Sequence, residues 1–229
     1  MIGLCALSRL HKNQKFRRSE GAPAQAPLTS PKWVSIFTQL VGEDAMIANY
    51  DAKAVAEVMG LAFVRLPKER DPQEEVSGSA CIEVDGSALI VVGRAVPVRG
   101  RRVSSPSPVL IEKAVETGLP REALARLAET IAGSDKAKAV AIERGIVPKT
   151  TLERRQSRLS RQESERTERL ARLFVQARRA LGTESEAREF MTAPHPELEG
   201  RSPFEAAKTD LGARRAEQIL NALEFGLAL

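Results

Sequence analysis

The apolar and polar positions between Val147 and Leu181 repeat with the period of an α-helix. Ser160 and Glu163 have the spacing of a capping box, in which the hydroxyl accepts from the third helical amide and the carboxylate accepts from the cap amide. A long helix is therefore predicted to begin near Arg161. Its apolar positions recur at spacings of three and four, which predicts one buried stripe: Leu170, Leu173, Phe174, Ala177 and Leu181.

The segment before this helix contains four shorter helical patterns, at residues 109–118, 120–133, 135–145 and 149–156. Pro120 suits a first helical position and Asp135 suits an N-cap. The last two patterns are separated by a tight turn after Gly145, and the second of them is basic. This arrangement fits a helix-turn-helix whose recognition helix is 149–156. A plain helical hairpin inside a bundle fits the same pattern and remains an alternative.

Two more capping boxes, Thr183 with Glu186 and Ser202 with Glu205, predict helices in the last fifth of the chain. Gly212 is expected to separate the second of these helices from the final one. The final helix is predicted to bury one stripe: Ala213, Ala216, Ile219, Leu220 and Leu223.

The chain ends in apolar residues that have no evident partner within the final helix. Gly226 is a plausible left-handed helix stop, which leaves a short tail outside the helix. The residues without an internal partner are Phe225, Leu227, Ala228 and Leu229. Such a tail either frays or contacts another molecule.

The first half of the chain has weaker patterns. Residues 1–32 are basic and rich in Pro, which predicts a disordered tail. Residues 33–95 predict a small α+β region, with helical patterns at 33–42 and 52–60 and a hairpin that turns at Asp85-Gly86. Residues 96–107 read as a linker, with a domain boundary near Pro108. The predicted fold class is therefore mainly α, with 108–158 as the helix-turn-helix region and 159–229 as a C-terminal helical domain.

Composition supports a mainly helical fold, and the charge distribution locates a basic region. The chain has 229 residues, of which only 4% are aromatic, and this favours helices over a β-sandwich. From 136 to 182 it has thirteen Lys or Arg against five Asp or Glu, whereas 183–229 has five against nine. The positive charge is therefore local, and an acidic partner is expected to meet it there. The alternative is a solvated helix face on which Glu and Arg pair at i, i+4.

No catalytic, metal-binding or cofactor-binding motif is visible in the sequence. Cys5 and Cys81 are isolated, and neither forms a ligand set with His11 or His195. No apolar run approaches the length of a membrane span, and the N-terminus does not fit a secretory signal, so a cytoplasmic location is expected. A mitochondrial presequence is a minor alternative. The chain is predicted to be a non-enzymatic protein.

Five segments carry a resemblance to a known family: GLPREALARL, TTLERRQSRLSRQESERTERLARL, AREFMTAP, LEGRSPFEAA and DLGARRAEQILNALEFG. Over residues 108–229 the chain resembles the Xre/MbcA/ParS antitoxins. The resemblance implies a helix-turn-helix region followed by a toxin-binding domain, and a cognate toxin of the RES class, which consumes NAD. It also implies a homodimer, and a C-terminal end that lies at the mouth of the toxin's NAD pocket.

These observations together predict a type II antitoxin that blocks the active site of its toxin and binds operator DNA for autoregulation. The predicted DNA-binding residues are Lys149, Thr150, Thr151, Arg154, Arg155, Arg158 and Arg161. The predicted toxin-binding residues are Phe225, Gly226, Leu227, Ala228 and Leu229. Residues 1–107 are expected to be dispensable for neutralisation. The alternative function is a stand-alone helix-turn-helix regulator without a toxin partner.

Overall fold

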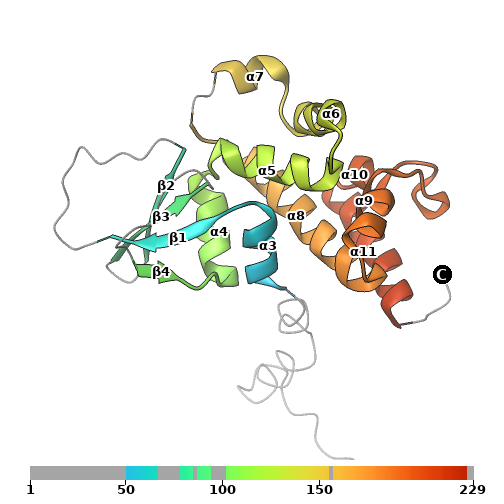
Figure 1. Ribbon diagram of the computed structural model, residues 1–229, viewed down its shortest axis with the longest axis horizontal. Coiled ribbons are helices and arrows are strands. Elements are labelled where there is room, and N and C mark those ends of the chain that lie inside the picture. Colours follow the sequence, from blue (N-terminus) through green and yellow to red (C-terminus); the bar gives the residue numbers. More distant parts are fainter. Residues whose placement is uncertain (1–49, 67–77, 85–86, 94–101, 155–156, 226–229) are drawn as a thin grey trace, which may run out of the picture. The chain divides into compact units, whose positions relative to one another are not determined.

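The computed structural model describes residues 50–66, 78–84, 87–93, 102–154 and 157–225, all of which lie in one compact unit (Figure 1). The predicted basic tail, the helical pattern at 33–42 and the residues from Gly226 onward lie outside the described ranges. The elements in chain order are α3 (Ala52–Val58), β1 (Ala62–Arg65), β2 (Ala80–Val84), β3 (Ser87–Val92), β4 (Arg102–Ser104), α4 (Pro108–Thr117), α5 (Arg121–Ala132), α6 (Lys136–Ile146), α7 (Lys149–Arg154), α8 (Arg161–Leu181), α9 (Glu184–Thr192), the 3-10 helix η1 (Pro196–Leu198), α10 (Pro203–Ala206) and α11 (Asp210–Phe225). The mainly α fold class is confirmed, with one small sheet.

The four strands form an antiparallel sheet in the order β2-β3-β1-β4. The predicted hairpin is confirmed, since Val84 pairs with Ser87 across the two residues between β2 and β3. Sequence reasoning missed β1, whose four residues are too few to show an alternating pattern. It also missed β4, which lies in the segment read as a linker. A three-residue edge strand pairs on one side only, so Arg- and Ser-rich sequence can form it.

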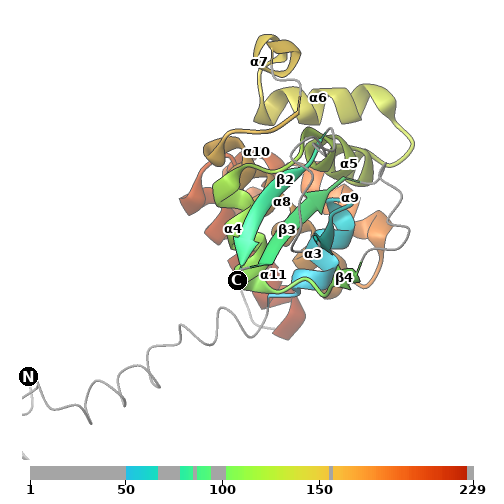
Figure 2. The ribbon, with the colours of Figure 1, turned by 90° about the vertical axis from the view of Figure 1, so that its left-hand side faces the viewer.

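Both faces of the sheet are apolar. On the face that joins the main core, Phe63 and Val91 are fully buried. On the opposite face, Val64, Ile90 and Val92 form a second small cluster. The continuous apolar run in β3 reflects this two-sided burial, which a strand with one solvated face does not need. Figure 2 shows β2 and β3 in front of α8.

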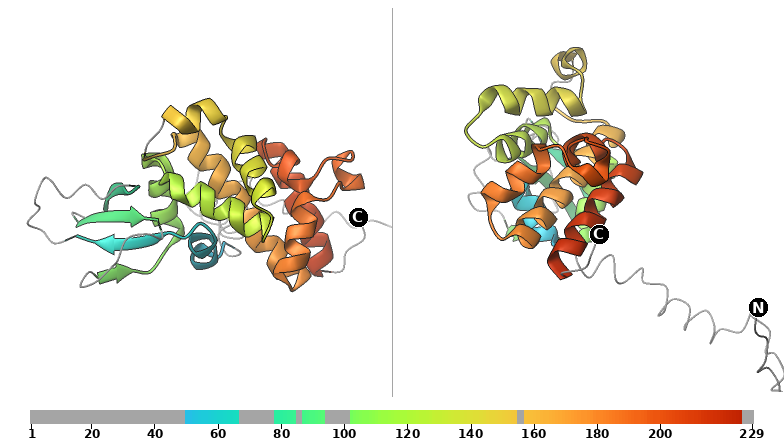
Figure 3. Two further views of the ribbon diagram at one scale, coloured as in Figure 1. Left: turned by 45° about the horizontal axis from the view of Figure 1, so that its top comes forward. Right: turned by 90° about the vertical axis from the view of Figure 1, so that its right-hand side faces the viewer.

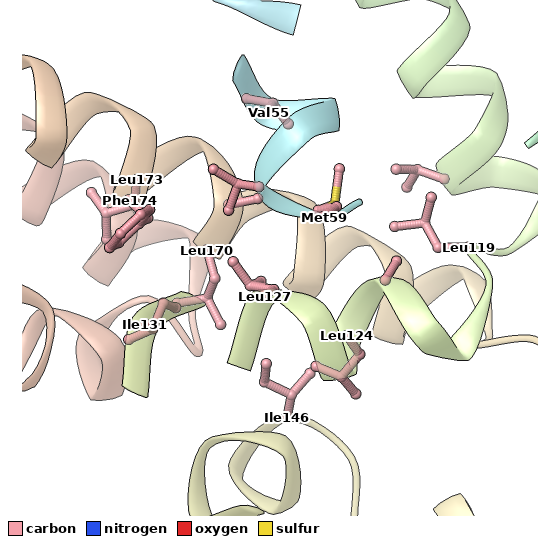
Figure 4. Packing of buried hydrophobic residues seen from close by; sticks show 14 of the residues in the cluster. Val55, Met59, Leu119, Leu124, Leu127, Ile131, Ile146, Leu170, Leu173 and Phe174 are labelled. Carbon is pink, nitrogen blue, oxygen red and sulfur yellow. The ribbon is translucent and has the colours of Figure 1, made fainter. Parts of the chain in front are cut away.

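The main core is centred on α8, which contacts α3, α4, α5, α6, α9 and α11. Its predicted stripe is confirmed at Leu170, Leu173 and Phe174, which are at most 2% exposed. Val55 of α3 and Met59, the C-cap residue of that helix, enter the same cluster (Figure 4). The apolar core therefore continues across residue 108, from the α3 and sheet layer into the helical half.

The capping predictions at Ser160 and Ser202 are confirmed, because each pairs reciprocally with a glutamate three residues later. At Thr183 only the N-cap bond forms as predicted. Here the Thr183 hydroxyl also donates to the Glu186 carboxylate at 2.6 Å, instead of the carboxylate accepting from the cap amide. A carboxylate accepts from one strong donor as readily as from another, so the sequence spacing alone does not distinguish these bonds.

Gly212 has a different role from the one that the sequence predicts. It lies in the first turn of α11, not in a break before the helix. A Cβ at this position would lie 2.0 Å from the carbonyl oxygen of Ala206. Because backbone cannot yield as a side chain can, glycine is what allows α11 to begin against the end of α10.

Candidate partner-binding surfaces

The helices α6 and α7 lie where the sequence predicts either a helix-turn-helix or a plain helical hairpin. Asp135 caps α6 through its side chain, and Ile142 and Ile146 are the buried residues of that helix. Val147 is buried in the turn, and Leu152 is the buried residue of α7. Figures 1 and 3 show α7 on the side of α6 that faces away from α8. This short helix is therefore held by one apolar side chain and presents most of its surface to solvent.

The start of α7 brings together three of the predicted DNA-binding residues. Lys149 and Thr150 are exposed, and Thr151 is half-buried. The Lys149 ammonium lies 3.6 Å from the Glu153 carboxylate one turn later. Such exposed pairs are weak, so the lysine remains available to a phosphate. Arg155 and the side chain of Arg154 lie outside the described part of the chain.

Two of the other predicted DNA-binding residues make contacts within the chain. Arg158 is half-buried and donates from Nε to the carbonyl oxygen of Ser79 at 2.7 Å, which ties the segment before α8 to the sheet. Arg161 pairs with Glu165 at 3.0 Å and with Glu116 of α4 at 3.5 Å. The hydrogen bond that Arg161 donates to Glu165 and the charges of both glutamates raise the pKa of Arg161.

A series of polar contacts, here called the polar ladder, joins α8 to α11 and pairs three arginines of α8. Its four rungs are Arg169–Asp210 at 3.9 Å, Arg172–Glu217 at 3.1 Å, Gln176–Asn221 at 2.7 Å and Arg179–Glu224 at 2.9 Å. The partners follow in the same order along both helices, so the helices are parallel. Among the described residues, three arginines of the basic segment thus pair with the acidic C-terminal segment, while Lys149 and Arg161 pair at i, i+4 as the alternative reading supposes.

Tyr50, the first described residue, also forms a hydrogen bond with α8. The Tyr50 hydroxyl donates to the Glu168 carboxylate at 2.9 Å. Burial is the largest cause that raises the pKa of each group, and Arg172 opposes the shift of Glu168. This hydrogen bond connects the segment before α3 to the centre of α8.

Helix α6 also packs directly on the C-terminal helices. A Cβ on Gly145 of α6 would lie 2.8 Å from the ring of Phe204 in α10. The Lys208 ammonium lies 5.5 Å from the centroid of that ring. Lys138 of α6 donates to the Thr192 hydroxyl at 3.0 Å. Glycine at 145 therefore serves close helix contact, although the sequence reads as a helix end there.

The loop between α9 and α10 is held in a fixed conformation. Glu199 has a φ of 60°, a left-handed backbone conformation that residues other than glycine adopt at a cost. Arg215 of α11 donates to the Glu199 carboxylate at 2.9 Å and to the Glu197 carbonyl at 2.8 Å. The hydrogen bond from Arg215 is the largest cause that lowers the pKa of Glu199. Two bonds from one guanidinium thus stabilise a strained turn beside α11.

The C-terminal end of α11 exposes apolar side chains. Leu223, predicted to be buried, is 48% exposed, and Phe225 is 64% exposed. The stripe Ala213, Ala216, Ile219 and Leu220 is buried as predicted. Leu223 lies on the same side of α11 as this stripe. It is close to the end of the helix, where fewer neighbouring residues cover it. It is an apolar surface residue that periodicity alone could not find. Gly226, Leu227, Ala228 and Leu229 lie outside the described residues.

No group of three or more His, Cys, Asp or Glu side chains that could hold a metal occurs among the residues that the structure describes. None of the described helices is both long enough and apolar enough to cross a membrane. The arrangement consists of packed helices with an outward helix pair and an exposed apolar helix end. The described helices thus form a module whose exposed surfaces suit contacts with other macromolecules.

The comparison with protein families identifies part of this module. Residues 176–226 match the antitoxin Xre/MbcA/ParS C-terminal toxin-binding domain. The match begins in the last turns of α8 and includes α9, η1, α10 and α11. The resemblance drawn from the sequence is thereby confirmed for this segment, and it supports an antitoxin role with a toxin as partner. An antitoxin role is a regulatory one. No curated protein matches the chain.

Proposed function

We propose that this chain is the antitoxin of a type II toxin–antitoxin system and neutralises a RES-type, NAD-consuming toxin in the cytoplasm. Residues 225–229 block the active site of the toxin sterically, without chemistry of their own. The antitoxin acts as a homodimer within the toxin complex and binds operator DNA for autoregulation. The observation that carries the proposal is the toxin-binding match at 176–226.

The exposed end of α11 supports the location of the blocking residues. Leu223 and Phe225 present apolar surface directly before the apolar tail. Moving a large apolar side chain from water into a protein pocket is favourable, by about 25 cal/mol per Å² of apolar surface buried. A helix end of this kind suits the mouth of an enzyme pocket better than it suits solvent.

The test uses the full chain and the RES-domain protein encoded beside it. Purified toxin is incubated with NAD, and NAD consumption is followed with increasing amounts of the chain. We expect inhibition that is complete near stoichiometric amounts, because a steric plug acts by occupancy. If the chain binds operator DNA but leaves NAD consumption unchanged, the stand-alone regulator becomes the better description.

Operator binding is proposed to use the start of α7. Lys149 and Thr150 are exposed there and suit contacts to base edges, whereas the basic side chains that follow suit phosphates. Arg158 is less suited than the sequence predicts, because it is half-buried and contacts Ser79, whereas Arg161 is exposed and its pairs with Glu116 and Glu165 are as weak as that of Lys149. A charge reversal at Arg158 would therefore disturb the fold as well as any DNA contact.

We expect Lys149→Glu combined with Arg155→Glu to weaken operator binding and to reduce its dependence on salt, since fewer counterions are released from phosphates. The measurement is operator affinity by fluorescence anisotropy at several salt concentrations. Lys53→Glu combined with Lys113→Glu removes as much positive charge from α3 and α4 and serves as the matched control. If both double variants bind operator equally, α7 is not the DNA-binding helix.

A further inference from the structure

The helix α11 has three sides with different surroundings. One side is buried and contains Ala213, Ala216, Ile219 and Leu220. A second side forms the polar ladder with α8. The third side carries Leu211, Arg214, Gln218 and Phe225, all of which are exposed. Their spacings of three, four and seven place them on one stripe of the helix.

Two of the four residues on this third side are large and apolar. Leu211 is 73% exposed and Phe225 is 64% exposed, and they are the two most exposed large hydrophobic residues in the described part of the chain. A single exposed leucine needs no explanation. Two such residues on one stripe, both within the segment that matches a toxin-binding domain, favour a contact surface.

The one charged residue of the third side, Arg214, has a partner on the same helix. Arg214 pairs with Asp210 at 3.1 Å, and Asp210 also lies 3.9 Å from Arg169 of α8. The stripe is therefore apolar at both ends, with the amide of Gln218 between them. From Leu211 to Phe225 it extends over fourteen residues of helix, or about 21 Å at the usual rise.

We propose that the third side of α11 lies in an apolar groove of the toxin, with a hydrogen-bonding group of the groove opposite Gln218. Recognition of this kind places one face of a helix in a complementary groove and reads residues about a turn apart. The inference rests on the proposed antitoxin function and extends the contact from the C-terminal end back to Leu211. The groove anchors the antitoxin, and the tail beyond α11 then reaches the active site.

The test compares two exposed apolar residues in the full-length chain. Leu211→Asp places a charge on the third side, whereas Val109→Asp places one on α4, where Val109 is 54% exposed and outside the matched segment. Affinity for the RES-domain toxin is measured by calorimetry, and circular dichroism checks the fold. We expect Leu211→Asp to weaken binding by about tenfold or more and Val109→Asp to leave it unchanged. A photo-crosslinking residue at 211 gives a second readout that does not depend on charge, and we expect it to link to the toxin.

Equal toxin affinity of Leu211→Asp and the wild-type chain would overturn the inference while leaving the antitoxin function intact. A wild-type chain that does not bind the toxin at all would remove both. Sedimentation without toxin separates a further case. If Leu211→Asp dissociates a dimer of the chain but binds toxin as tightly as before, a second copy occupies this side, and the inference is wrong.

Discussion

A fragment that begins at Pro108 is expected not to fold cooperatively. Its helices would lose the layer formed by α3 and the sheet, from which Val55, Met59, Phe63 and Val91 are fully buried in the common core. Each large apolar side chain contributes about 1.5–3 kcal/mol when buried. The sum over this layer is comparable with the net stability of a typical domain, which is about 5–15 kcal/mol.

Thermal unfolding followed by circular dichroism measures this effect. The control fragment begins at Met46 and keeps the whole compact unit, so we expect it to show one cooperative transition. The fragment 108–229 should unfold without a clear transition and should bind a hydrophobic dye. A sharp transition in 108–229, together with neutralisation of the toxin, would restore the expectation from sequence that the first half is dispensable.

Deletion of residues 225–229 is expected to abolish inhibition of the toxin while the complex still forms. The reason is the proposed separation of roles along α11, in which Leu211 and Gln218 on its third side hold the partner and the chain from Phe225 onward enters the pocket. NAD consumption by the toxin measures inhibition, and co-purification measures complex formation. We expect NAD consumption close to the rate of free toxin, even when the truncated chain is in excess.

The control for this deletion replaces residues 225–229 by five alternating Gly and Ser residues. This variant keeps the length of the chain and removes only its apolar character. If an apolar plug is required, the replacement should inhibit as poorly as the deletion. Full inhibition by the deleted chain would instead place the blockade within residues 187–224.

The helical half of the fold could be predicted well because its signals are local. Capping residues such as Asp135 and Ser160 mark helix starts through hydrogen bonds to residues three positions away. The sheet was harder to predict, since β1 and β4 are short and are defined by pairing with each other. No local pattern encodes a pairing between residues that lie forty positions apart.

The candidate site was predictable in position but not in its contacts. The basic character of α8 is plain in the sequence, yet its partners Glu217 and Glu224 lie about forty-five residues further on. Arg158 likewise contacts Ser79, which directly precedes strand β2. The exposure of Leu223 depends on where the neighbouring elements end. Each of these facts requires the tertiary structure, because sequence periodicity describes one helix at a time.

The parallel ladder between α8 and α11 has a consequence for the engineering of chimeric antitoxins. The family match begins at Gln176, which makes this residue an obvious junction for exchanging toxin specificity between relatives. A junction there would take Asp210 and Glu217 from one parent while leaving Arg169 and Arg172 from the other. Chimeras joined before Arg161 would instead inherit both sides of the ladder together, so they should retain stability when a new specificity is transferred.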